Sequence, residues 1–280
     1  MTENKVMSSF IQTPPTGWSK CLFYQHQLKN GQSENVLYEF NVNNIVCEPM
    51  KRLSFGGHVV SQKYHITDTD RKIDVLTDIV LQTPVPMRVP FGKSINKTEG
   101  DKEKTTVDLS FWGMEQDPRM VQFYNNIKAW DDFNVETAKL NRCEWFSNDS
   151  IHPDVLAHFY KPMSRQRIRR KDKKAFSPQL TLQLKKRYNR YECDVYDSDR
   201  NIATTDDITK GCSVIALYRF GGLWFAKNSF SPSNQVLQLQ IQEKNRIRGF
   251  CITPDETIPA PFARSNASTD NDVVMSMSTV

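Results

Sequence analysis

The sequence predicts a β-rich α+β fold in which an antiparallel barrel or sandwich carries a helical insertion. Several short segments alternate apolar and polar residues, which is the period of a half-buried strand. One stretch in the middle of the chain instead has apolar residues three and four positions apart, the spacing of an amphipathic helix. Strand patterns lie on both sides of that stretch, and 280 residues with 38% hydrophobic content suffice for a sizeable core.

The part of the chain before the helical stretch is predicted to form strands separated by polar turns. Residues 36–42 and 106–111 alternate apolar and polar side chains, and residues 74–82 are rich in Val, Ile and Leu. The proline-flanked residues 86–91 are expected to be extended but irregular, because proline donates no ladder hydrogen bond. The polar residues 93–105 contain Gly100 and are expected to form an exposed loop.

The helix signal is clearest at Asp117 and Pro118, an N-cap residue followed by a first-turn residue. Apolar side chains then recur at helical spacing and form one face: Met120, Phe123, Tyr124, Ile127 and Trp130. A second helix is expected over residues 134–143 and a short one over residues 153–160.

Strand patterns resume after the helical stretch. The predicted strands are residues 180–184, 191–195, 213–220, 223–227, 236–242 and 247–252. Gly221-Gly222 separates two apolar-aromatic runs and is the pattern of a two-residue hairpin turn.

The ends of the chain are polar, which sets the expected domain organisation. Residues 1–34 are predicted to be a loosely attached N-terminal arm, residues 35–252 the main domain with helical insertion near 117–160, and residues 253–280 a flexible tail. The six cysteines lack zinc spacing, the N-terminus has no signal-peptide pattern, and no apolar run is long enough for a membrane span. We therefore expect an intracellular protein with reduced thiols that is neither secreted nor membrane-bound.

Charge is the strongest functional signal. The formal net charge is only +5, but residues 161–191 contain twelve Lys or Arg and one acid, Asp172. The remaining residues carry 25 basic and 31 acidic side chains. A basic segment in an otherwise acidic chain is typical of a protein that binds a polyanion.

The basic segment has two parts with different predicted structures. Residues 165–174 are too charged to pack and are expected to form a solvated loop. Residues 180–191 pass from a strand pattern into a basic run in which Tyr188 and Tyr191 offer rings for base stacking. The alternatives are a solvated charge run without a partner and, for residues 165–174 alone, a nuclear-import signal.

Other aromatic and basic residues have two interpretations. In residues 218–227 alternate side chains point to opposite faces, so most of the rings are expected in the core and some could stack on bases. The pairs Phe111-Trp112 and Trp145-Phe146 are equally ambiguous. Arg88, Lys93 and Lys97 could line the same groove or belong to a solvated loop.

Motifs for catalysis are weak. Asp68 and Asp70 form a DxD with His58 and His65 nearby, which is a pattern of metal sites but also of polar turns. The sequence lacks the phosphate-loop, dinucleotide, zinc-protease and nucleophile-elbow motifs. We expect no catalytic residue, metal or cofactor.

The order of three short patterns resembles that of single-stranded DNA-binding proteins of large DNA viruses and, distantly, of phage replication proteins with a single OB-type barrel. These patterns are MRVPFG at 87–92, LTLQLKK at 180–186 and GGLWFAK at 221–227, with the helical stretch between the first two. The resemblance covers roughly residues 36–252. It implies an OB-like barrel that binds single strands during replication with little sequence preference. Phage members carry an acidic C-terminal tail, whereas here only Asp270 and Asp272 follow Glu256.

Together these observations predict a non-enzymatic single-stranded DNA-binding protein. RNA, replication proteins and a second copy of the chain remain open as further partners. The expected interface residues are Arg88, Lys93, Arg165, Arg167, Arg169, Arg170, Lys173, Lys174, Lys185, Lys186, Arg187, Tyr188, Arg190, Tyr191, Trp224 and Phe225. The alternatives are a viral structural or nucleocapsid-type protein that packs nucleic acid, and a metal-dependent nuclease that uses Asp68 and Asp70.

Overall fold

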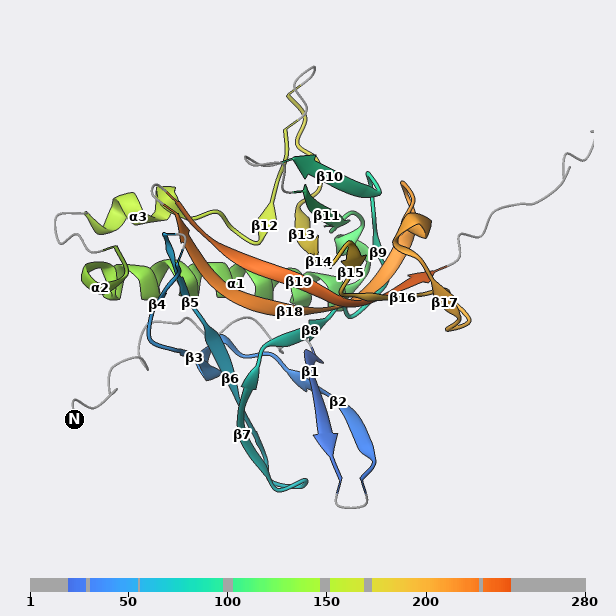
Figure 1. Ribbon diagram of the computed structural model, residues 1–280, viewed down its shortest axis with the longest axis horizontal. Helices are drawn as coiled ribbons and strands as arrows, with labels where there is room; N and C mark the ends of the chain where they lie inside the picture. The colour runs from blue at the N-terminus through green and yellow to red at the C-terminus, as the bar shows by residue number, and fades with distance from the viewer. Residues whose placement is uncertain are drawn as a thin grey trace, which may run out of the picture. The chain divides into compact units, whose positions relative to one another are not determined.

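The computed structural model describes residues 20–28, 31–54, 56–97, 103–146, 152–168, 173–226 and 229–242. Strands dominate this part of the chain, and the three α-helices come after the first group of strands and before the second in the sequence (Figure 1). The observed class is therefore β-rich α+β. No helix in the described part is long and apolar enough to cross a membrane.

In the described part of the chain, eleven strands precede the helices. They are β1 Lys20–Gln27, β2 Ser33–Glu39, β3 Ile45–Cys47, β4 Lys51–Arg52, β5 His58–Val60, β6 Gln62–Asp68, β7 Ile73–Asp78, β8 Val80–Gln82, β9 Met87–Arg88, β10 Lys93–Lys97 and β11 Glu103–Ser110. The helices are α1 Pro118–Leu140, α2 Arg142–Phe146 and α3 Pro153–Phe159, and single 3-10 turns occur at Val42–Asn44, Met114–Gln116 and Thr205–Asp207.

Among the described residues after the helices, there are eight strands. They are β12 Ser164–Arg165, β13 Gln179–Leu184, β14 Lys186–Arg187, β15 Arg190–Tyr191, β16 Asp194–Tyr196, β17 Ile202–Ala203, β18 Ser213–Ala226 and β19 Ser229–Gln242. The main sheet runs in the order β17-β16-β19-β13-β11-β9-β18-β8-β1-β2. Because β18 also pairs with β19, the strands β19, β13, β11, β9 and β18 pair in a ring.

The strand predictions before the helices were correct in part. The predicted strand 74–82 is two strands, β7 and β8, which pair in different sheets. The predicted loop 93–105 was wrong for residues 93–97 and 103–105, because β10 and the start of β11 pair antiparallel there, while residues 98–102 lie outside the described residues. The predicted arm includes β1, where Cys21 and Leu22 are fully buried, so this part of residues 1–34 is packed into the sheet.

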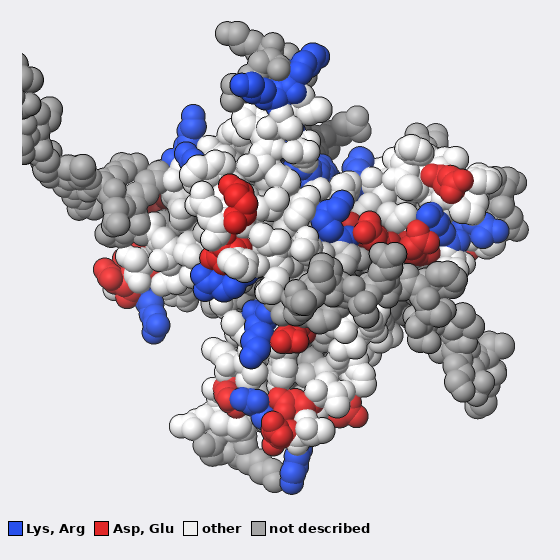
Figure 2. Space-filling view, turned by 180° about the vertical axis from the view of Figure 1, so that it is seen from behind, with Lys and Arg blue, Asp and Glu red and all other residues white. Residues whose placement is uncertain are grey.

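Two hairpins, β1–β2 and β6–β7, extend toward the bottom of Figure 1. Their surface charges pair with one another: Arg71 lies 3.2 Å from Glu34, and Lys63 pairs with Asp78. Figure 2 accordingly shows both acidic and basic side chains in this lower region. This part of the surface therefore does not offer the uncompensated positive charge that a polyanion needs.

Helix α1 starts where the sequence predicts. The Asp117 carboxylate accepts a hydrogen bond from the Arg119 backbone N–H at 2.9 Å, and Pro118 occupies the first turn. The helix continues without a break to Leu140, so the separate helix expected over 134–143 is its C-terminal half followed by α2. The short helix expected over 153–160 is confirmed as α3.

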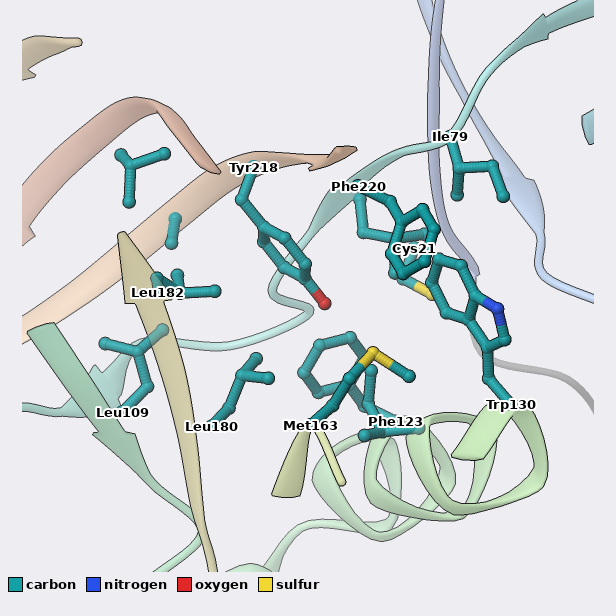
Figure 3. Close-up of a cluster of buried hydrophobic side chains, with 14 of the residues drawn as sticks. Cys21, Ile79, Leu109, Phe123, Trp130, Met163, Leu180, Leu182, Tyr218 and Phe220 are labelled. Carbon is teal, nitrogen blue, oxygen red and sulfur yellow. The ribbon is translucent and has the colours of Figure 1, made fainter. Parts of the chain in front are cut away.

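The core lies between α1 and the inner face of the strands. Trp130 of α1 packs against Phe220 of β18 with ring centroids 4.6 Å apart. Figure 3 shows Tyr218 and Phe220 facing Phe123 and Trp130 across this core. Leu109 of β11 and Leu180 and Leu182 of β13 close its other side, and all three are fully buried.

The long hairpin β18–β19 corrects another prediction. Gly221-Gly222 is not the hairpin turn, because the pairing continues past it to Ala226 and Ser229. The two glycines lie opposite Ser233 alone, between the pairs Phe220–Asn234 and Leu223–Pro232, so they form a β-bulge inside β18. The predicted strand 247–252 and the predicted tail 253–280 lie outside the described residues.

Candidate nucleic-acid interface

A groove of about 600 Å³ lies on the outer face of the main sheet. Its floor comes from three neighbouring strands: Thr106 of β11 pairs with Gln183 of β13, which pairs with Gln235 of β19. Residues directly opposite one another on paired strands share a face, so these side chains point the same way. The described lining residues are Lys104, Thr106, Pro162, Met163, Arg165, Thr181, Gln183, Lys185, Gly221, Trp224 and Ser231 to Gln235.

The lining is positively charged. It includes Lys104, Arg165 and Lys185, and none of the described lining residues is acidic. The Lys185 ammonium group lies 3.6 Å from the Glu192 carboxylate at the border of the groove. The Arg165 side chain donates a hydrogen bond to the Pro162 carbonyl at 3.3 Å, which orients its guanidinium group. This part of the surface therefore attracts anions.

Trp224 gives the groove an aromatic wall. The bulge at Gly221-Gly222 shifts the strand alternation by one residue, so Leu223 and Phe225 point into the core and Trp224 points out. The indole is 40% exposed, and its Nε1–H donates to the Gly221 carbonyl at 3.1 Å. The ring is thus both accessible and held in place.

The expectation that Phe225 could stack on bases was wrong. Its ring is 5% exposed and stacks on Phe230 with centroids 5.2 Å apart and on His58 at 4.5 Å. The same burial lowers the pKa of the His58 imidazole. Phe225 therefore belongs to the core, and the bulge is the physical reason.

The described parts of residues 165–174 lie at the base of a two-stranded arm. Arg165 pairs with Gln179, the Phe176 N–H donates to the Arg167 carbonyl at 2.8 Å, and Ile168 bridges Ala175. The expected solvated loop is therefore paired where it is described. Arg165, Arg167, Lys173 and Lys174 are exposed there, while Arg169 and Arg170 lie outside the described residues. Basic side chains gather at the top of Figure 2, where this arm extends in Figure 1.

Several predicted residues lie away from the groove. The Lys186 ammonium group is 3.0 Å from Glu103, which raises the pKa of Lys186, and it lies 5.0 Å from the centre of the Tyr191 ring. Lys93 lies over the same ring at 5.3 Å and pairs with Asp206. Tyr191 is therefore held between two lysines and does not line the groove.

The hairpin β14–β15 carries the remaining predicted residues. Tyr188 is 89% exposed at its turn, and the Arg187 guanidinium group lies 5.6 Å from the ring. Tyr188 and Asn189 both have positive φ, the conformation of a tight hairpin turn. Arg190 is exposed on the same hairpin. The structure thus presents these three side chains to solvent, outside the groove lining.

Arg88 lies on the outer face of the sheet beyond the groove. Its guanidinium group is 5.5 Å from the centre of the Trp112 ring. The Lys97 side chain lies outside the described residues. Of the predicted residues, the groove brings together Arg165, Lys185 and Trp224. Lys104 was missed because its polar segment was predicted to be a loop; it lies two positions before Thr106 in β11 and therefore on the same face.

The DxD residues do not form a metal site in the described part of the chain. The Asp68 carboxylate accepts hydrogen bonds from the Tyr38 hydroxyl at 2.8 Å and from the Arg71 N–H at 3.0 Å. His65 is paired with Asp74 at 2.7 Å. Among the described residues no three His, Cys, Asp or Glu side chains converge as metal ligands.

Comparisons with known proteins give distant similarities. A model described as "Family of unknown function (DUF5871)" matches residues 119–257, and no curated protein matches the chain. The crystal structure of gp2.5, a single-stranded DNA-binding protein encoded by bacteriophage T7, is 13% identical, with 62% of this chain and 91% of that chain covered and a TM-score of 0.37.

A single-stranded DNA-binding protein from bacteriophage Enc34 is similar in two further structures. Its C-terminal truncation is 11% identical, covering 71% of this chain and 96% of that chain, with a TM-score of 0.34. The protein in its complex with single-stranded DNA is 13% identical, and the match covers 72% of this chain and 98% of that chain with a TM-score of 0.32. At these identities and TM-scores the likeness is distant, so the ligand has to be argued from the residues of this chain.

Proposed function

We propose that this chain is a viral single-stranded DNA-binding protein that acts in DNA replication, recombination or repair with little sequence preference. One observation carries the proposal: Lys104, Arg165, Lys185 and an exposed Trp224 line one groove whose described lining contains no carboxylate. Cations and a flat ring in one groove are the two features that bind phosphates and bases of a single strand.

The cations account for affinity. Each phosphate that a Lys or Arg neutralises releases condensed counterions, so binding weakens as salt rises. Three phosphate contacts on a single strand correspond to a slope of roughly −2 in log affinity against log salt. Arg167, Lys173 and Lys174 on the arm are exposed and would add to this slope if the strand reaches them.

Trp224 and the polar lining account for base contacts. Stacking of a base on an aromatic ring contributes about 1–3 kcal/mol and depends little on which base it is. Gln183 offers an amide donor and acceptor on the groove floor. The neighbouring Gln235 amide already donates to Glu192 at 3.2 Å and accepts from Arg219 at 3.4 Å.

The strand pairing supports an OB-like barrel for this domain. The strands β19, β13, β11, β9 and β18 pair in a ring around the buried side chains of Figure 3. OB folds bind oligonucleotides across an outer strand face. In this chain the groove lies on the outer face of β11, β13 and β19, which is the equivalent kind of surface.

The test is a binding titration of the whole chain with single-stranded and duplex DNA and single-stranded RNA across a salt series. We expect preference for single strands and a salt slope that becomes shallower by about 2 when Lys104, Arg165 and Lys185 are all replaced by Gln. A matched variant replaces Lys51, Lys72 and Lys139, which do not line the groove, and should bind like the wild type.

Three results would overturn the proposal. Equal affinity for duplex and single strands would instead indicate a nucleocapsid-type packing protein. Equal losses in the two triple variants would show that net charge and not the groove governs binding. Cleavage of the DNA in Mg²⁺ would indicate the nuclease alternative.

A further inference from the structure

We propose that the binding surface continues beyond the groove to a second stacking subsite, which is formed by Trp112 and Arg88. Phe91 and Arg167 lie between this subsite and the groove. The ligand of the subsite would be further nucleotides of the single strand that fills the groove. The inference rests on the proposed function, because it concerns the path of the same ligand.

The sheet places the groove and the subsite on one face. Arg165, which lines the groove, pairs with Gln179 of β13. Gln179 pairs with Ser110 of β11, and Ser110 pairs with Arg88 of β9. Because directly opposite residues share a face, Arg165 and Arg88 stand at the two ends of one row that crosses four strands.

Two exposed rings lie along this row. Trp112 is 62% exposed and Phe91 is 43% exposed, so part of each ring is open to a ligand. Each ring has a guanidinium group nearby, Arg88 at 5.5 Å from the Trp112 centre and Arg167 at 5.6 Å from the Phe91 centre. An arginine on a ring leaves room for a base on the remaining exposed ring surface and for a phosphate at the guanidinium edge.

The acid on this face is already neutralised. Asp108 of β11 lies between the groove and the subsite and is 4% exposed. Its carboxylate accepts hydrogen bonds from Arg167 at 2.8 Å and from the Thr181 hydroxyl at 2.7 Å. The Arg167 side chain remains 55% exposed above it, so a passing phosphate meets the guanidinium group and not the carboxylate.

Trp112 is held at a fixed distance from the groove. It lies two residues after the end of β11, and its backbone N–H donates to the Ser110 hydroxyl at 3.2 Å. From Lys104 in the groove to Ser110 the strand covers roughly 20 Å at about 3.3 Å per residue, and Trp112 lies beyond that end. Short oligonucleotides would therefore occupy the groove alone, and longer ones would reach both positions.

The experiment is an affinity series with oligo(dT) of increasing length, from four to thirty nucleotides in steps of two. The proteins are the wild type, Trp112→Ala, Trp112→Phe, Arg88→Gln and Trp224→Ala, each as the full chain. Trp112→Ala should bind short oligo(dT) like the wild type and long oligo(dT) at least roughly fivefold more weakly. Trp112→Phe should restore most of the loss because it keeps a ring, and Trp224→Ala should weaken binding at every length.

The outcomes separate this inference from the proposed function. Wild-type protein that binds no oligo(dT) would remove the proposed function and this inference together. Wild-type binding that is weakened by Trp224→Ala but unaffected by Trp112→Ala at all lengths would overturn the second subsite alone. An equal effect of Trp112→Ala at the shortest and longest lengths would also overturn it, because the ring would then belong to the first contact.

Discussion

At the scale of single residues, the least expected group is Asp131 of α1, a carboxylate that is 3% exposed. Its Oδ1 atom accepts hydrogen bonds from the Tyr160 hydroxyl at 2.6 Å and from the Met163 N–H at 2.9 Å, while Oδ2 is buried with no partner among the described residues. Burial raises the pKa of Asp131 from 3.8 to about 6. Asp131 therefore anchors the segment that carries Met163 and Arg165 into the groove. Because the carboxylate is buried, its ionised form lowers the stability of the folded state.

The raised pKa predicts a pH dependence of stability. The native state binds this proton more tightly than the unfolded state, so the free energy of unfolding falls as pH rises from about 4 to 6 and stays lower above that. Asp131→Asn keeps an acceptor without the charge. We expect it to be more stable than the wild type at pH 8, by up to about 3 kcal/mol, and to differ little at pH 4.

Urea unfolding at several pH values measures this difference. Asp132→Asn is the matched control, since Asp132 is the exposed neighbour on the same helix. Because Asp131→Asn removes this one carboxyl group and changes no other side chain, the difference between variant and wild type isolates Asp131. An Asp131→Asn protein that is less stable than the wild type at pH 8 would contradict this account.

Lys185 and Lys186 offer a paired test at the same scale. They are neighbours in sequence, but Lys185 lines the groove whereas Lys186 is bound to Glu103 and lies over Tyr191. Lys185→Gln should weaken single-strand binding and make the salt slope shallower by about 0.7, and Lys186→Gln should do neither. Filter binding across a salt series distinguishes them. A larger loss in Lys186→Gln would place the ligand on the other side of β13.

At the scale of elements, the bulge in β18 decides which aromatic residues are accessible. Gly222 has φ +95°, and a Cβ atom there would lie 2.9 Å from the Val60 carbonyl oxygen and 3.0 Å from Val59 Cγ2. Gly221 requires neither a positive φ nor the absence of a side chain, since a Cβ atom there would meet Ser233 at 3.4 Å, an ordinary contact distance. The bulge therefore depends on Gly222, and through the bulge so does the outward position of Trp224.

This dependence predicts unequal effects of two alanine substitutions. Gly222→Ala should lower the free energy of unfolding by about 1–3 kcal/mol because of strain and close contact. Gly221→Ala should change it by less than about 1 kcal/mol. Chemical unfolding of the two variants measures both values. Equal stability of the two proteins would show that the bulge does not require the glycine.

The predictability of each element followed the strength of its local signals. The start of α1 was predictable because Asp is favoured at the N-cap of a helix and Pro in its first turn, and Asp117 and Pro118 occupy these positions. The strand β10 was not, because its sequence KSINK is polar and lies at an edge, where a strand needs few buried side chains. Gly221-Gly222 misled because a bulge and a hairpin turn both favour glycine.

At the scale of the whole molecule, the basic segment is distributed over several surfaces. The sequence predicts one continuous interface. In the structure, successive side chains point to opposite faces, so Lys185 lines the groove and Lys186 pairs with Glu103 outside it. Tertiary pairing then adds Lys104 from β11 and Trp224 from β18, which are far away in sequence. Composition predicts a polyanionic ligand, but it does not predict which face carries the groove, because that depends on strand register and on the bulge.

Photo-crosslinking can test whether a single strand lies in the groove on the outer face of β11, β13 and β19. The probe is oligo(dT) that carries 5-iododeoxyuridine at every second position, and peptide mapping locates the adducts. We expect adducts at Trp224 and on the groove-facing residues of β11 and β13, lost when unlabelled oligo(dT) competes. Adducts confined to the β14–β15 hairpin or to the β1–β2 and β6–β7 hairpins would contradict this placement of the strand.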